Sequence, residues 1–148
     1  MSAPTSPGYL LWLMSNKWQA QQRRALKPFD LTHVQFVLLA SLVYAPGGQK
    51  LTQIQLAERT ETDPMMTSQV VRKLEAKGFI QRTPNIEDKR AFNLEATDKG
   101  TELTKRAIVA VEAVDSKFFE AIETDMSDFV EMMRKLVWTP DNLNKKEN

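Results

Sequence analysis

The sequence contains no cysteine and only one histidine. Without cysteine the chain can form no disulfide bond, no thiolate metal site and no cysteine-based redox sensor. His33 has no second histidine to join it, and a metal site needs several convergent ligands, so we expect no metal and no cofactor. No spacing of serine, histidine and acidic residues is typical of a catalytic triad. We therefore predict no catalytic residues and no enzyme activity.

Long apolar runs are also absent. A membrane-spanning helix needs roughly 18–20 consecutive apolar residues, and no stretch of the sequence approaches that length. Residues 1–8 carry no basic side chain ahead of the short apolar run at residues 10–14, which argues against a signal peptide. We expect a cytoplasmic protein that does not bind membranes. Its 148 residues, 42% of them hydrophobic, fit a single domain with a hydrophobic core.

The sequence lacks an overall excess of charge of either sign, because its formal net charge is only +1. The distribution is uneven. Residues 72–90 carry six basic and three acidic side chains, a local charge of +3, whereas residues 112–135 carry three basic and seven acidic side chains, a local charge of −4. The first region could face phosphates and the second could not. An uneven solvated surface would give the same pattern, so charge alone does not decide between the two.

Two helices are predicted in the first part of the chain. Residues 9–26 place Leu10, Met14 and Trp18 at helical spacing, and Pro28 ends that helix. Thr32 is a good N-cap for a second helix over residues 33–45. Apolar residues surround most of this second helix, so we expect it at the centre of the core.

A pair of shorter helices follows. Thr52 and Gln55 have the spacing of a capping box at the start of a helix that should end near Thr60. Asp63-Pro64 marks the start of the next helix, because aspartate is a good N-cap and proline is favoured at the first helical position. This second helix should run to about Lys77. The apolar positions predicted to face inward are Ile54, Leu56 and Ala57 in the first helix and Val70, Val71 and Leu74 in the second.

The spacing of apolar residues then changes from helical to alternating. Residues 79–83 and 92–96 are predicted strands, and Phe92, Leu94 and Ala96 should share one apolar face. The polar, turn-rich segment between them predicts a β-hairpin with a long charged tip.

Two helices are predicted after the hairpin. Thr97 can cap a long helix from residue 98 to about Ile122, and a further helix covers residues 127–138. The long helix carries an apolar stripe at spacings of three and four residues and would extend about 37 Å. Since that length exceeds the core of one small domain, the stripe favours a dimer interface over an internal contact.

A tight helix pair followed by a hairpin is typical of a winged helix-turn-helix. The second helix of such a pair fits the DNA major groove, and the first braces it. Glutamine can pair with adenine, and arginine with guanine or phosphate. A long hairpin tip can bring an arginine to the adjacent minor groove. The predicted DNA-binding residues are Thr67, Ser68, Gln69, Arg72 and Lys73 on the second helix and Asp88, Lys89 and Arg90 on the wing.

Several short motifs resemble the MarR family of bacterial transcription regulators in order and spacing. In chain order these are Leu31-Thr32-x-x-Gln35-Phe36-x-x-Leu39, Leu51-Thr52-x-x-x-Leu56-Ala57, Leu74-Glu75-x-x-Gly78-Phe79-Ile80-x-Arg82, Asp88-x-Arg90 and Thr97-x-x-Gly100. The resemblance implies a homodimer whose two winged lobes bind a pseudo-palindromic operator as a regulator, more often a repressor than an activator. It assigns Arg90 to the minor groove, with Asp88 as its orienting partner. At Gln69 many relatives have a basic residue, so their sequence preference does not transfer.

The resemblance also implies a cleft for a small aromatic or phenolic effector. Trp12, Trp18, His33 and Phe36 are the candidate lining residues, although packing within the core and the dimer is the simpler explanation for the aromatic side chains.

The fold expected overall is mainly α with a small β-hairpin wing, in one domain over residues 1–148. Residues 31–97 form its DNA-binding lobe, and residues 9–26 and 98–138 form helical dimerisation arms. The alternative function is a dimeric winged-helix protein-interaction module without DNA binding.

Overall fold

The computed structural model describes residues 5–138, which fall into two compact units that divide between Val114 and Asp115. Within the described residues no single helix has both the length and the apolar composition to span a membrane, although the bent pair Pro7–Phe29 and His33–Val43 passes that test when taken together.

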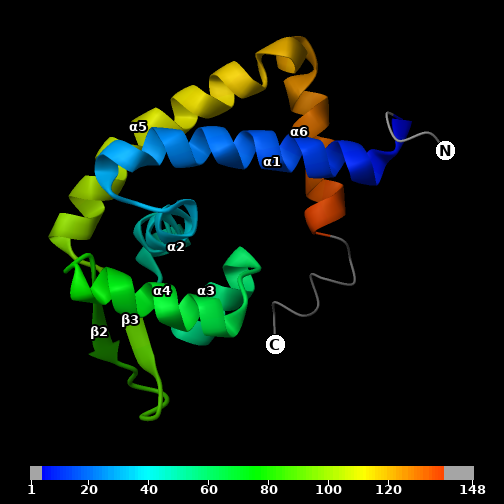
Figure 1. Ribbon diagram of the computed structural model, residues 1–148. Helices are drawn as coiled ribbons and strands as arrows, with labels where there is room; N and C mark the ends of the chain where they lie inside the picture. Colours follow the sequence, from blue (N-terminus) through cyan, green and yellow to red (C-terminus); the bar gives the residue numbers. More distant parts are fainter. Residues whose placement is uncertain (1–4, 139–148) are drawn as a thin grey trace. The chain divides into compact units, whose positions relative to one another are not determined.

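Helix α1 (Pro7–Leu26) and helix α2 (His33–Val43) begin the first unit (Figure 1). A short 3-10 helix, η2 (Lys27–Phe29), joins them. At the start of α2 the hydroxyl of Thr32 accepts a hydrogen bond from the N–H of Gln35, and the Gln35 side chain accepts one from the N–H of Thr32. The predicted N-cap is therefore confirmed, and α2 ends two residues earlier than expected.

The helix pair consists of α3 (Gln53–Thr60) and α4 (Pro64–Ala76). Thr52 and Gln55 form the predicted capping box at the start of α3. Asp63 caps α4 by accepting a hydrogen bond from the N–H of Met66 at 3.0 Å. Both predicted helix starts are confirmed. Such starts can be predicted from the sequence because an N-cap depends only on residues a few positions apart.

The sheet has three antiparallel strands in the order β1-β3-β2, not the two of the predicted hairpin. Strands β2 (Ile80–Pro84) and β3 (Phe92–Ala96) form the wing. The added strand β1 (Leu51–Thr52) follows the short 3-10 helix η3 (Pro46–Gly48) and pairs Leu51 with Leu94. Two residues are too few to show an alternating pattern, and β1 therefore escaped prediction.

Helix α5 (Asp98–Phe118) ends four residues before the expected Ile122. A 3-10 helix, η4 (Glu120–Asp125), follows, and its Ile122 leaves the helical conformation with φ −118°. Helix α6 (Met126–Val137) completes the second unit. There the ring of Phe119 packs edge-on to Phe118 at 5.0 Å and lies 6.0 Å from Phe129.

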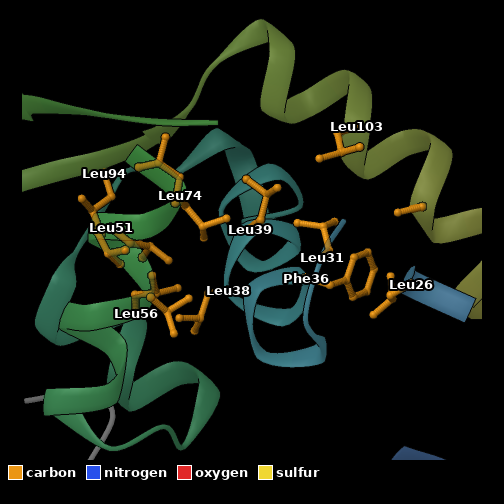
Figure 2. Packing of buried hydrophobic residues seen from close by; sticks show 14 of the residues in the cluster. Leu26, Leu31, Phe36, Leu38, Leu39, Leu51, Leu56, Leu74, Leu94 and Leu103 are labelled. Carbon is orange, nitrogen blue, oxygen red and sulfur yellow. The ribbon is translucent and has the colours of Figure 1, made fainter. Parts of the chain in front are cut away.

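Helix α2 lies at the centre of the first unit, as its apolar surface predicts. Leu38 and Leu39 have no exposed surface, and α2 contacts α1, α3, α4 and β3. Figure 2 shows Leu38 on the side of Leu56 and Phe36 on the side of Leu26. One cluster of buried side chains thus joins residues from all these elements and from α5.

Two predicted core positions are wrong. Ile54 of α3 is 72% exposed and Phe92 of β3 is 49% exposed. Ile54 follows the cap by two residues and lies on the outer side of α3. Phe92 pairs with Pro84 at the wing end of the sheet, beyond the part that Leu94 anchors in the core.

Gly100 provides a stability test for the junction between β2 and α5. A Cβ at this buried position would collide with the backbone carbonyl oxygen of Phe79. We expect Gly100→Ala to lower the free energy of unfolding by about 1–3 kcal/mol, because backbone atoms cannot move aside as a flexible side chain can. Urea unfolding measures the change. The matched control is Gly8→Ala in α1, where a Cβ meets nothing within 4 Å; equal stability of the two variants would contradict the prediction.

Candidate nucleic-acid interface

Helix α4 buries one face and exposes the other. Its inner face consists of Val70, Val71 and Leu74, which belong to the core cluster. Gln69, Arg72 and Lys73 are exposed, and Ser68 is partly exposed. The Nη2 atom of Arg72 donates a hydrogen bond to the Ser68 hydroxyl at 2.8 Å, so the arginine lies along the helix one turn back. Four of the predicted DNA-binding residues of α4 are thus placed on accessible surface.

Thr67 is a correction to the predicted set. Its side chain is fully buried, and its hydroxyl donates a hydrogen bond to the carbonyl oxygen of Asp63 at 2.9 Å. Threonine in a helix commonly bonds the carbonyl four residues earlier in this way. Thr67 therefore supports the first turn of α4 and offers no side-chain atom to a ligand.

The two methionines of the first turn extend the exposed face. Met65 is 72% exposed and Met66 is 48% exposed. Met65, Gln69 and Arg72 stand at i, i+4 and i+7 and share one stripe. The stripe formed by these three residues is called the outer stripe of α4 below.

The wing tip is ordered by side chains that bond its own backbone. The Asn85 Oδ1 atom accepts hydrogen bonds from the N–H groups of Glu87 and Asp88 at 2.9 and 3.0 Å. The Asp88 Oδ1 atom accepts one from the N–H of Arg90 at 2.9 Å. The N–H of Ala91 in turn donates to the Asp88 carbonyl at 3.1 Å. Asparagine and aspartate often build turns in this manner.

The structure places Asp88 beside Arg90 but gives it a different contact from the predicted one. Asp88 binds the backbone N–H of Arg90, and among residues 5–138 the Arg90 guanidinium has no hydrogen bond or ion pair. Lys89 and Arg90 are both exposed. Asp88 therefore orients the chain that carries Arg90, whose charged group stays accessible.

A hollow of about 490 Å³ separates the wing from the start of α3. Arg82 and Arg90 line it together with the exposed apolar side chains Ile54 and Phe92. The Nε atom of Arg82 also binds the Glu75 carboxylate at 2.8 Å, which joins strand β2 to helix α4. Helix α4 and the wing are thus connected through side chains as well as through the core.

Comparisons with known proteins agree with this arrangement. The MarR family model matches residues 31–92. The uncharacterized HTH-type transcriptional regulator YdcH of Bacillus subtilis is 49% identical over 118 residues, which cover 79% of this chain and 80% of YdcH. The HTH-type transcriptional repressor Rv2887 of Mycobacterium tuberculosis is 31% identical over 87% of this chain and 91% of its own length. The chain belongs to the MarR family.

Solved structures of MarR-family proteins share the fold. A crystal structure of Rv2887 in complex with salicylic acid has a TM-score of 0.70 and 30% identity, covering 89% of this chain and 96% of that one. A mutant of MarR from E. coli, complexed with operator DNA, has a TM-score of 0.77 and 24% identity, covering 88% and 91%. The predicted mainly helical winged helix-turn-helix is therefore confirmed, and the chain belongs to a family of DNA-binding transcription regulators.

Two of the four effector candidates are in ring contact in this MarR-family chain. Trp18 and His33 pack edge to face with ring centroids 5.0 Å apart, which joins α1 to α2. Phe36 is buried in the core cluster, so the packing interpretation holds for that residue. Trp12 is 66% exposed on α1. Trp18 and His33 are therefore the two candidates that the structure shows in contact.

An ion pair at the base of the wing makes stability depend on pH. The Lys50 Nζ atom lies 2.7 Å from the Glu95 carboxylate, and this hydrogen bond holds the pKa of Glu95 below its usual value. A carboxyl group with a lowered pKa stabilises the folded state above its unfolded pKa, and the effect disappears as the pH falls through its folded pKa.

We expect Lys50→Met to lower the free energy of unfolding at pH 7 by about 0.2–1 kcal/mol, the range of exposed ion pairs. The difference from wild type should shrink as the pH falls through the lowered folded pKa of Glu95 and be smallest at about pH 2, where carboxyl groups are protonated. Urea unfolding at the two pH values measures it. Lys105→Met is the control, since Lys105 is exposed and forms no ion pair within the described part of the chain. A loss in Lys50→Met that is the same at both pH values would refute the role of the ion pair.

Proposed function

We propose that this protein is a homodimeric, sequence-specific DNA-binding repressor that binds a pseudo-palindromic operator. The observation that carries the proposal is the outer stripe of α4, whose members Met65, Gln69 and Arg72 are all exposed on a helix anchored by its opposite face. Methionine can contact thymine methyl groups, glutamine can pair with adenine, and arginine can pair with guanine or phosphate. The proposal of repression is supported by the name of Rv2887, an HTH-type transcriptional repressor.

The wing extends the contact beyond the major groove. Arg90 projects from a tip that Asn85 and Asp88 hold in one conformation, and Lys89 is exposed beside it. An arginine gains energy from the negative potential of a narrow minor groove. In the proposed complex, Ser68, Gln69, Arg72 and Lys73 face the major groove while Arg90 enters the minor groove. Since the partner is chromosomal DNA, the proposal places the protein in the bacterial cytoplasm.

Dimerisation is proposed to use the helical arms, residues 9–26 and 98–138, with residues 31–97 as the DNA-binding lobe. Both arms carry large apolar side chains exposed to solvent in the single chain. They are Tyr9, Leu10, Leu11 and Trp12 in α1, and Met132, Leu136, Val137 and Trp138 at the end of the chain's described part. Several large apolar side chains exposed on each arm support an interaction site there. A twofold dimer would place two identical lobes on a palindromic site.

We also propose that a small aromatic acid releases the operator. The support is the contact between Trp18 and His33 at the junction of α1 and α2, together with the salicylic acid complex of Rv2887. Titration of salicylic acid into the preformed operator complex tests this part of the proposal separately, because operator binding is measured first in the absence of the acid.

Operator binding and its dependence on Arg90 test the main proposal. Sites selected from random DNA should bind two chains per duplex, and log affinity should fall linearly with log salt. Arg90→Ala should weaken binding by about tenfold, the effect of about 1.4 kcal/mol, and reduce the salt slope. Fluorescence anisotropy measures both. Lys27→Ala, which removes an exposed charge outside both the arms and the DNA-binding lobe, is the control. A folded dimer without salt-sensitive affinity for any duplex would instead support the protein-interaction module.

Asp88 supplies a second test, since its proposed role is to accept a hydrogen bond and not to form an ion pair. Asp88→Asn keeps the Oδ1 acceptor for the Arg90 N–H and removes a negative charge near phosphate, so operator affinity should stay equal or rise. Asp88→Ala removes the acceptor and should lower affinity about three- to tenfold through disorder of the tip. The same anisotropy titration distinguishes them. If both variants lose affinity equally, the carboxylate charge matters and the assignment is wrong.

A further inference from the structure

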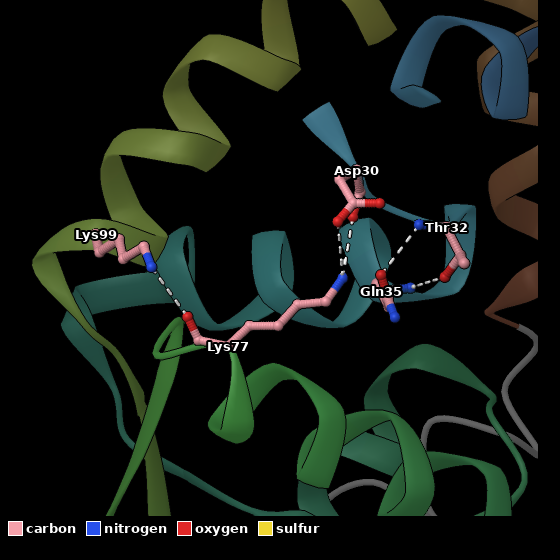
Figure 3. Close-up of polar contacts among 5 residues, drawn as sticks. All are labelled: Asp30, Thr32, Gln35, Lys77 and Lys99. Carbon is pink, nitrogen blue, oxygen red and sulfur yellow. Dashed lines mark hydrogen bonds and ion pairs between the residues drawn. The ribbon is translucent and has the colours of Figure 1, made fainter. Parts of the chain in front are cut away.

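The end of helix α4 is bound by the first residues of α5. The carbonyl oxygens of three consecutive residues, Lys77, Gly78 and Phe79, each accept a hydrogen bond from this segment. The Lys99 Nζ atom donates to Lys77 at 3.2 Å (Figure 3). Thr97 donates its hydroxyl hydrogen to Gly78 at 2.6 Å and its N–H to Phe79 at 3.0 Å. These five residues are called the α4–α5 clamp below.

Three further contacts join the same residues. The Lys99 Nζ atom lies 5.1 Å from the centre of the Phe79 ring, a cation–π contact. Gly100 approaches the Phe79 carbonyl so closely that no Cβ fits between them. The Thr97 hydroxyl also accepts the N–H of Gly100 at 3.1 Å, so the same side chain caps α5 and binds the end of α4. Movement of α5 at this point must therefore move the end of α4.

The side chain of Lys77 binds the end of α4 to a third segment. Its Nζ atom donates to the carbonyl oxygen of Asp30 at 3.1 Å and lies 3.6 Å from the Asp30 carboxylate (Figure 3). Asp30 stands in the connection between α1 and α2, with a positive φ of 53°. The last turn of α4 is thus bound to the segments that follow α1 and begin α5, the two helices of the proposed dimer arms.

The geometry of DNA sets how precisely α4 must be oriented. Thirteen residues make α4 about 20 Å long. A tilt of about 10° at its end would shift the other end by roughly 3.4 Å, which is about the rise of one base pair. A dimer that distinguishes operators differing by one base pair in half-site spacing must therefore keep the tilt of each α4 below about 10°.

We propose that Thr97 and Lys99 are positioning residues that transmit the geometry of α5 to α4 and thereby set the operator spacing that the dimer prefers. The inference rests on the proposed function as a DNA-binding homodimer. It goes beyond that function by naming residues that touch no DNA and yet determine which spacing is bound.

Half-site spacing is the decisive measurement. The probes are the duplex selected by the wild type and the same duplex with one base pair inserted or deleted at its centre. In Lys99→Met the ratio of affinities for the selected and altered duplexes should fall by about two- to tenfold. Lys99→Arg, which can still donate to the Lys77 carbonyl, and Lys27→Met, which alters an exposed lysine outside both the arms and the DNA-binding lobe, should keep the wild-type ratio. Circular dichroism melting establishes that each variant is folded.

A measurement without DNA separates positioning from contact. Because the chain has no cysteine, Lys73→Cys gives one spin-label site per copy on the exposed face of α4. The distance distribution between the two labels in the dimer should broaden when Lys99→Met is added and stay narrow when Lys27→Met is added. Thr97→Val, with Thr97→Ser as its matched control, should repeat the broadening.

The outcomes are distinct. A folded Lys99→Met protein with the wild-type spacing preference and a narrow distance distribution would overturn the inference. Reduced affinity for all three duplexes by an equal factor would overturn it too, since that result indicates a general loss of stability or charge. A wild-type protein that binds no duplex selectively would overturn the proposed function first.

Discussion

The burial of helix α2 is the constraint on which the first unit depends. An amphipathic helix needs a partner for its apolar face, and α2 is apolar around most of its surface, so several helices can pack on it at once. Leu38 and Leu39 are completely buried among α1, α3, α4 and β3. Because α4 places Val70, Val71 and Leu74 in this core, its opposite face must remain in solvent. The exposed outer stripe of α4 is thus a consequence of how the core is built.

Local signals in the sequence predicted the start of each helix in this lobe well. The caps at Thr52 and Asp63 involve residues within three positions of one another, and the structure shows both. Errors arose where distant residues decide the outcome. Strand β1 exists because Leu51 pairs with Leu94, more than forty residues later, and Ile54 is exposed because no element of residues 5–138 covers that side of α3. Pattern alone does not contain such information.

The candidate site shows the same division between local and distant effects. Helical spacing correctly placed Gln69 and Arg72 outside, but it could not show that Thr67 turns its hydroxyl back to Asp63 and is covered by the core. In the wing, the motif Asp88-x-Arg90 predicted that the two residues are close. It did not show which group Asp88 binds, because Asp88 could accept either from the Arg90 guanidinium or from the Arg90 backbone N–H. At the junction of α4 and α5, Thr97 and Gly100 stood out as a motif, yet their contact with Phe79 is a property of the fold.

Charge explains why the position of each lobe matters. The local charge of +3 at residues 72–90 is modest, and the whole chain has a net charge of only +1. Nonspecific attraction to phosphate from one copy is therefore weak, and specificity must come from a few base contacts worth about 1–3 kcal/mol each. In the proposed homodimer, two copies double that number only if both α4 helices reach their half-sites together. A weakly charged regulator therefore depends strongly on rigid positioning, and three carbonyl oxygens bound in succession at the end of α4 provide it.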